Sequence, residues 1–123
     1  MTVVGLRNEG RDTELGSKIR VADSWWPRLR GMIGHPPPAE GEGLLLAPCS
    51  GVHMHWMKYA LDILFLDGED RVVAVYDELR PWRFSKTHKD AVCAVELPVG
   101  TLRRTGTRIG DRVSRQTERQ AAA

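Results

Sequence analysis

One stretch decides the fold of this chain, and it runs Leu61-Asp62-Ile63-Leu64-Phe65-Leu66-Asp67-Gly68-Glu69-Asp70-Arg71-Val72-Val73-Ala74-Val75-Tyr76. Residues 61–66 are apolar apart from Asp62, which is typical of a buried strand. Residues 68–70 are turn formers, and a second apolar run follows them up to Tyr76. The stretch therefore predicts a β-hairpin.

Shorter runs on both sides of this hairpin predict further strands, because they are apolar or alternate between polar and apolar residues. They lie at residues 3–6, 17–22, 44–47, 91–97 and 112–114, and a half-turn is expected at about residues 99–105. A helix is predicted at about residues 24–33, because Ser24 is a typical N-cap and apolar residues then recur at helical spacing. The prolines at 36–38 cannot continue it.

Length and composition fit one ordinary globular domain, with 123 residues, 41% hydrophobic and 28% charged. We expect a mainly β fold, a small closed or nearly closed barrel or sandwich whose helix covers one opening or edge. Closure would remove the exposed edges of so many short strands. The domain should span residues 1–114, with residues 115–123 as a flexible C-terminal tail.

The chain contains neither a run of about 18 apolar residues nor the pattern of a secretion signal. We therefore expect a cytoplasmic protein with no membrane partner, whose Cys49 and Cys93 stay unpaired. The net charge of +2 is too small to favour nucleic acid as a partner. Arginines are nevertheless frequent in the second half, at positions 80, 83, 103, 104, 108, 112 and 115.

Residues 48–67 concentrate side chains that can bind a metal or move a proton. Cys49, His53 and Met57 are spaced at four, so they share one face of either a helix or a strand. Soft sulfur and imidazole ligands suit copper(I) or zinc. The competing interpretation is core packing, because cysteine and methionine also fill apolar interiors well.

A polar pocket is the second hypothesis for this segment. An ionised Asp62 in an apolar strand is costly unless it has a partner, which must be a cation or a set of N–H donors. Lys58, Arg30 and Arg80 are the candidates. We expect His53 and Asp62 to line one concave cleft that recognises a small polar or anionic ligand. A structural ion pair or a turn cap at Asp62 is the alternative.

Glu96 is a comparable carboxylate at the end of the strand 91–97. With Asp62 it could form an acid–base pair of the kind that hydrolases use. Trp56 and Trp82 are interpreted mainly as core residues, with a stacking platform for a sugar or base as the alternative. The chain shows no nucleophile elbow, phosphate loop or paired metal motif.

Several ordered blocks resemble a known family, domain of unknown function family 192. They are Arg28–Met32, Val52–His53, Met57–Lys58, Leu61–Asp67, Leu79–Arg83, Val95–Gly100 and Gly110–Val113. Together they cover about residues 17–114. His53, Met57, Asp62, Phe65 and Asp67 match the family pattern, whereas His55 does not. The resemblance implies a small, mostly β domain with no established activity.

The function predicted from these residues is a soluble small-ligand-binding or accessory domain, with no cofactor identified. Its site is predicted to use His53, Met57, Lys58, Asp62, Arg30, Arg80 and Glu96. One alternative is a small hydrolase or lyase that uses His53 with Asp62 or Glu96. Another is an arginine-rich module that binds a protein or nucleic acid.

Overall fold

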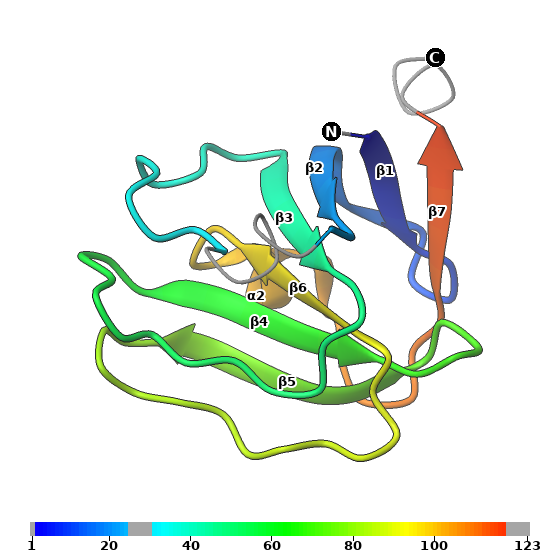
Figure 1. The fold of residues 1–123 in the computed structure, drawn as a ribbon. Coiled ribbons are helices and arrows are strands. Elements are labelled where there is room, and N and C mark those ends of the chain that lie inside the picture. Colours follow the sequence, from blue (N-terminus) through cyan, green and yellow to red (C-terminus); the bar gives the residue numbers. More distant parts are fainter. Residues whose placement is uncertain (1, 25–30, 118–123) are drawn as a thin grey trace.

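The computed structural model describes residues 2–24 and 31–117. Within them it places strands β1 (Val3–Asn8), β2 (Thr13–Ala22), β3 (Glu42–Leu46), β4 (Leu61–Leu66), β5 (Val72–Leu79), β6 (Cys93–Leu97) and β7 (Val113–Thr117), and helix α2 (Thr101–Thr105) (Figure 1). No helix in these two ranges is long and apolar enough to cross a membrane.

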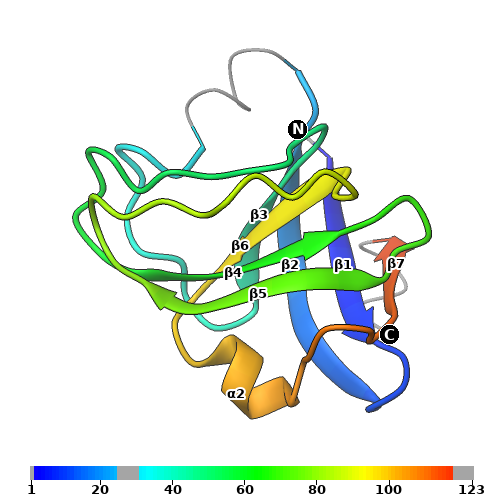
Figure 2. The ribbon, with the colours of Figure 1, turned by 90° about the horizontal axis from the view of Figure 1, so that it is seen from below.

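All the strands belong to one sheet, in the order β5-β4-β6-β3-β2-β1-β7. Neighbours are antiparallel except for β2 and β3, which run parallel. The sheet curls into a half-barrel (Figure 2), and its two edge strands approach at one end, where Arg71 and Arg112 form a β-bridge. Near this bridge the Val72 N–H donates to the Asp111 carbonyl at 2.8 Å. The prediction of a mainly β, nearly closed domain is confirmed.

The predicted hairpin is present as β4 and β5, with Leu64 opposite Val75. Its turn is fixed by Asp67, whose Oδ1 accepts the N–H groups of Glu69 and Arg71 at 2.9 and 3.0 Å. Several strands are longer than predicted, because pairing with a neighbour extends them beyond their apolar runs. β7 is one of these, and it continues past residue 114 to Thr117, opposite Val4 of β1.

The helical segments agree less well with the sequence predictions than the strands do. The predicted helix at 24–33 falls largely on residues 25–30, which lie outside the described residues, and residues 31–34 form turns. The segment 99–105 was expected to be a half-turn but contains helix α2. Gly106 ends this helix in the left-handed conformation, with φ 71°, and its N–H donates back into the last turn.

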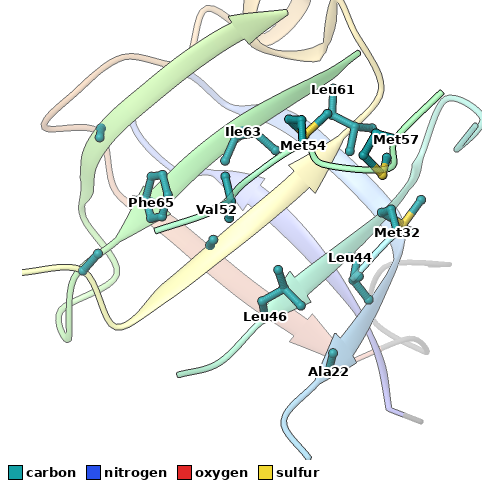
Figure 3. Close-up of a cluster of buried hydrophobic side chains, with 13 residues drawn as sticks. Ala22, Met32, Leu44, Leu46, Val52, Met54, Met57, Leu61, Ile63 and Phe65 are labelled. Atoms are coloured by element: carbon teal, nitrogen blue, oxygen red, sulfur yellow. The ribbon is translucent and has the colours of Figure 1, made fainter. Parts of the chain in front are cut away.

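Alternation along the strands gives the sheet two apolar faces. One face carries Leu61, Ile63 and Phe65 of β4 and is covered by the loop that follows β3 (Figure 3). The opposite face carries Leu64 and Leu66 and packs against Leu102 of α2, along with residues of β1, β2, β3 and β6. We call them the loop-covered face and the helix-covered face.

Gly43 in β3 sits where the sheet has no room for a side chain. A Cβ there would lie 2.7 Å from the Glu96 carbonyl oxygen and 2.9 Å from Ile19 Cδ1. Gly43→Ala should therefore lower the free energy of unfolding by about 1–3 kcal/mol, the usual range for overpacking. Urea denaturation measures this. Gly68→Ala is the control, because a Cβ at Gly68 would meet no atom within 4 Å. Equal losses in the two variants would contradict the packing account.

Candidate functional site

Two loops pair with each other over the loop-covered face. They are the β3–β4 loop, residues 47–60, and the β5–β6 loop, residues 80–92. The Met54 N–H donates to the Arg83 carbonyl at 2.7 Å, and the Trp82 N–H donates to the Met54 carbonyl at 2.9 Å. We call the two paired loops the loop ribbon. Val52 and Met54 of this ribbon are buried against the sheet, and His53 between them is exposed.

A small pocket of about 80 Å³ lies between this ribbon, the turn at residues 31–33 and the sheet. Its lining combines apolar residues with a carboxyl, an imidazole and four sulfur-bearing side chains. The polar and sulfur-bearing members are Met32, Cys49, His53, Met54, Met57 and Glu96. We call it the Glu96 pocket.

Glu96 reaches this pocket from β6, where it pairs with Ile63 of β4 and Leu44 of β3. Only 6% of the residue is exposed, and its Oε2 has no hydrogen-bond partner among the described residues. The backbone at Gly31 passes close by, since a Cβ there would lie 3.6 Å from Glu96 Oε1. Burial raises the pKa of this carboxyl to about 7.

Asp62 faces the other way, on the helix-covered face of β4. It is fully buried, but its carboxylate is satisfied by backbone groups. Oδ1 accepts the Glu78 N–H at 2.9 Å, and Oδ2 accepts those of Gly100 and Leu102 at 3.1 and 2.9 Å. Burial raises the pKa of Asp62, and these hydrogen bonds oppose the rise. Through these hydrogen bonds Asp62 links β4 to the start of α2 and to the end of β5.

This geometry corrects two expectations. His53 and Asp62 do not line one cleft, because His53 belongs to the Glu96 pocket on the loop-covered face, whereas Asp62 points to the helix-covered face. For the same reason Asp62 and Glu96 do not form an acid–base pair. Of the two kinds of partner expected for Asp62, cations and N–H donors, the structure has the N–H donors. The turn-cap interpretation therefore fits Asp62, because its carboxylate accepts backbone N–H groups.

The structure brings other predicted residues together. Cys49, His53 and Met57, the proposed metal ligands, all line the Glu96 pocket. Lys58 is exposed beside it, and Arg80 is exposed on the surface. Arg30 lies outside the described residues. Among the residues described, no three His, Cys, Asp or Glu side chains are placed to hold a metal ion, so a metal here would need methionine sulfur.

A wider groove of about 720 Å³ adjoins the Glu96 pocket and shares Met32 and Met57 with it. One wall is the segment 32–37 and the other is the segment 56–59. Tyr59 holds the walls together, because its hydroxyl donates to the His35 carbonyl at 3.0 Å. Burial, together with the nearby charge of Glu96, raises the pKa of Tyr59.

The family model DUF192, described as "Uncharacterized ACR", matches residues 6–115 of this chain. The chain belongs to the DUF192 family. Two archaeal relatives of this DUF192 protein are named UPF0127 proteins. The one from Thermococcus sibiricus is 28% identical over 96% of this chain and 79% of its own length. The one from Pyrococcus abyssi is 31% identical over 86% of this chain and 92% of its own length.

Two crystal structures share the DUF192 fold seen here. A protein of unknown function from Novosphingobium aromaticivorans has a TM-score of 0.77 and 18% identity, over 91% of this chain and 83% of that one. A protein from Sinorhizobium meliloti, called a "putative transcription regulator", has a TM-score of 0.78 and 21% identity, over 93% and 92%. At these identities the likeness concerns the fold alone, which is a mainly β single domain.

An aromatic strip runs along the exposed surface of the two paired loops, and it begins at His53, which also lines the Glu96 pocket. Ring centroids are 4.7 Å apart for His53 and His55, 5.5 Å for His55 and Trp82, and 5.0 Å for Trp56 and Trp82. Trp56 and Trp82 are 70% and 56% exposed, so the core interpretation of these two residues is wrong. Both have positive φ, 67° and 68°, a costly conformation for a bulky side chain.

Sequence reasoning missed two residues of the Glu96 pocket, Met32 and Met54. Met54 lies two residues after Val52, with the exposed His53 between them, so a strand-like interpretation of this loop would have placed the Val52 and Met54 side chains on the same inward side. Met32 carries no comparable signal, since its position depends on the turn after Gly31, where φ is 56°.

Proposed function

We propose that this DUF192 protein is a non-catalytic domain that binds one small ligand in the Glu96 pocket. The proposal rests on one observation: Oε2 of Glu96, a residue that is 6% exposed, has no hydrogen-bond partner in the part of the chain that the structure describes. Leaving such a group without a hydrogen bond costs about 1–3 kcal/mol, more when it is charged. A ligand that brings a positive charge or an N–H or O–H donor to Glu96 would remove this cost on binding.

The pocket limits what that ligand can be. A cavity of about 80 Å³ holds a single ion or a group of a few atoms. Its walls are otherwise apolar or sulfur-bearing, so Glu96 and His53 would set the orientation of what enters. A buried carboxylate repels anions, so of the small polar or anionic ligand expected from the sequence we keep only the polar kind, and we propose a cationic or hydrogen-bond-donating ligand.

Thermal unfolding with a panel of small probes tests this proposal. The probes are methylammonium, guanidinium, imidazole, Zn²⁺, and Cu⁺ under anaerobic conditions. A probe at 100 times its Kd should stabilise the protein by about 2.7 kcal/mol, seen as a higher Tm. We expect at least one probe to do so, with an affinity that falls at least tenfold in Glu96→Gln.

The matched control is Glu69→Gln, which removes the same charge from an exposed turn between β4 and β5. It should keep the full shift in Tm. The proposal is wrong if no probe shifts the Tm, or if every shift survives Glu96→Gln.

A catalytic function is the second candidate, because His53 and Glu96 line the same pocket. A carboxyl with a pKa of about 7 in the same pocket as a histidine is suited to acid–base catalysis near neutral pH. A broad hydrolase screen separates the candidates. Reproducible turnover that is lost in both His53→Ala and Glu96→Gln would replace the binding proposal with an enzyme.

The arginine-rich interaction module has weaker support. Arg103, Arg104 and Arg115 each lie within 4 Å of a carboxylate, which offsets part of their charge. The Sinorhizobium protein described above shares only the fold with this chain. Salt-sensitive binding to random oligonucleotides would revive this candidate.

A further inference from the structure

We propose that the ligand of the Glu96 pocket is a cuprous ion, bound by Cys49, His53 and Met57. The inference rests on the proposed function, whose site it shares. Four residues of the pocket lining carry sulfur, and this chemistry points to the ligand class.

The sulfur atoms of this chain are concentrated at one place. The sequence has four methionines and two cysteines. Met32, Met54, Met57 and Cys49 line the same pocket of about 80 Å³, and within the described ranges 2–24 and 31–117 only the sulfur of Cys93 lies elsewhere. Figure 3 shows the three methionines gathered toward one side of the apolar cluster, away from Phe65.

Soft donors of this kind select the metal. Thiolate and thioether sulfur, with imidazole, favour copper(I), whereas magnesium and calcium need oxygen ligands. Zinc takes cysteine, histidine and carboxylate ligands, usually four of them. No three side chains of those types are placed to hold a metal in the part of the chain described. The donors at this pocket therefore suit copper(I) and not zinc.

The unpartnered carboxyl is an independent sign of a cation in this pocket. Glu96 is more than nine-tenths buried, lines the same cavity and has an oxygen without a hydrogen bond among the described residues. A monovalent cation placed nearby would stabilise this carboxylate electrostatically, even without coordination by it. A purely apolar methionine core would gain nothing from a carboxyl at this position.

Binding of the cuprous ion exchanges one bond for another and releases one proton. The Cys49 thiol donates to the Gly51 carbonyl at 3.1 Å, and its Sγ–H bond breaks as the Sγ–Cu bond forms. The proton leaves to solvent, and no electron is transferred. The released proton balances the charge of the ion, so with Glu96 ionised the total charge of the pocket is unchanged, and the ion offsets one of the two negative charges, those of the thiolate and of Glu96.

Anaerobic titration with Cu⁺ against the chromophoric chelator bicinchoninate tests the inference on the full chain. We expect one equivalent to be taken from the chelator. Cys49→Ser, His53→Ala and Met57→Leu should each weaken the affinity at least tenfold. Met57→Leu conserves volume, and circular dichroism would verify that each variant is folded.

The matched control is His55→Ala, because the His55 ring lies 4.7 Å from that of His53 but does not line the pocket. It should change the affinity less than twofold. Copper K-edge absorption of the loaded wild-type protein gives a second readout that needs no variant. Sulfur scatterers are expected, and a shell of only oxygen and nitrogen would overturn the inference.

The same experiments separate the two proposals. Absence of one-equivalent Cu⁺ binding, with Glu96-dependent binding of methylammonium or guanidinium retained, would overturn the cuprous site and leave the proposed function standing. Absence of both would overturn both.

Discussion

Replacing Asp62 by alanine is expected to lower the free energy of unfolding by about 3–5 kcal/mol. The change leaves three backbone N–H groups without their acceptor, those of Glu78, Gly100 and Leu102. Each buried group left unsatisfied costs about 1–3 kcal/mol. Relief of the desolvation that raises the pKa of Asp62 offsets part of the sum.

Asp62→Asn should cost less than Asp62→Ala, because the amide keeps one oxygen acceptor but its nitrogen cannot accept an N–H. Urea denaturation gives both values, with the exposed Asp90→Asn as a control that should stay within about 0.5 kcal/mol of the wild type. Folded Asp62→Asn should also bind pocket probes as the wild type does. Weaker probe binding with unchanged stability would mean that Asp62 belongs to the site after all.

Glu96→Gln is expected to make the protein more stable than the wild type at pH 8 but not at pH 5. The carboxyl has an ordinary pKa of 4.5 and a pKa of about 7 when folded. Between these values the folded protein holds a proton that the unfolded chain has lost, so wild-type stability falls as pH rises through this window. The loss is complete above the folded pKa and amounts to about 3 kcal/mol.

The variant lacks this titration, so the stability difference between variant and wild type isolates Glu96 from the other groups. The difference should grow from below about 1 kcal/mol at pH 5 to about 3 kcal/mol at pH 8. At both pH values it is reduced by the cost of a buried glutamine amide that lacks hydrogen-bond partners. Asp111 does not contribute in this window, because its hydrogen bond with Arg11 lowers its pKa to about 2. A difference that is the same at both pH values would contradict a buried Glu96 of raised pKa.

The hairpin at residues 61–76 could be predicted because its signals are local. An apolar run, three turn formers and a second apolar run leave few alternatives. That Asp62 would be buried and in need of a partner also followed from its neighbours. The partners did not follow, since Gly100 and Leu102 lie 38 and 40 residues further along the chain.

The assignment of Asp62 and Glu96 to one site failed on strand register. Ile63 stands opposite Glu96, so Asp62 and Glu96 point to opposite faces of the sheet. A slip of one residue would have put them on the same face. Single-chain patterns do not determine the register of strands that are 30 residues apart. The same limit applies to His53, whose place depends on the ribbon formed with residues 82–85.

Titration of the Glu96 side-chain carboxyl by ¹³C NMR tests the central claim most directly, because a ligand pocket built on a buried, unpartnered carboxyl requires it to titrate abnormally. The expected midpoint for the free protein is a pKa of about 7, and it should fall when the strongest cationic probe of the panel is bound. A midpoint near the ordinary value of 4.5 that does not respond to any probe would contradict the account.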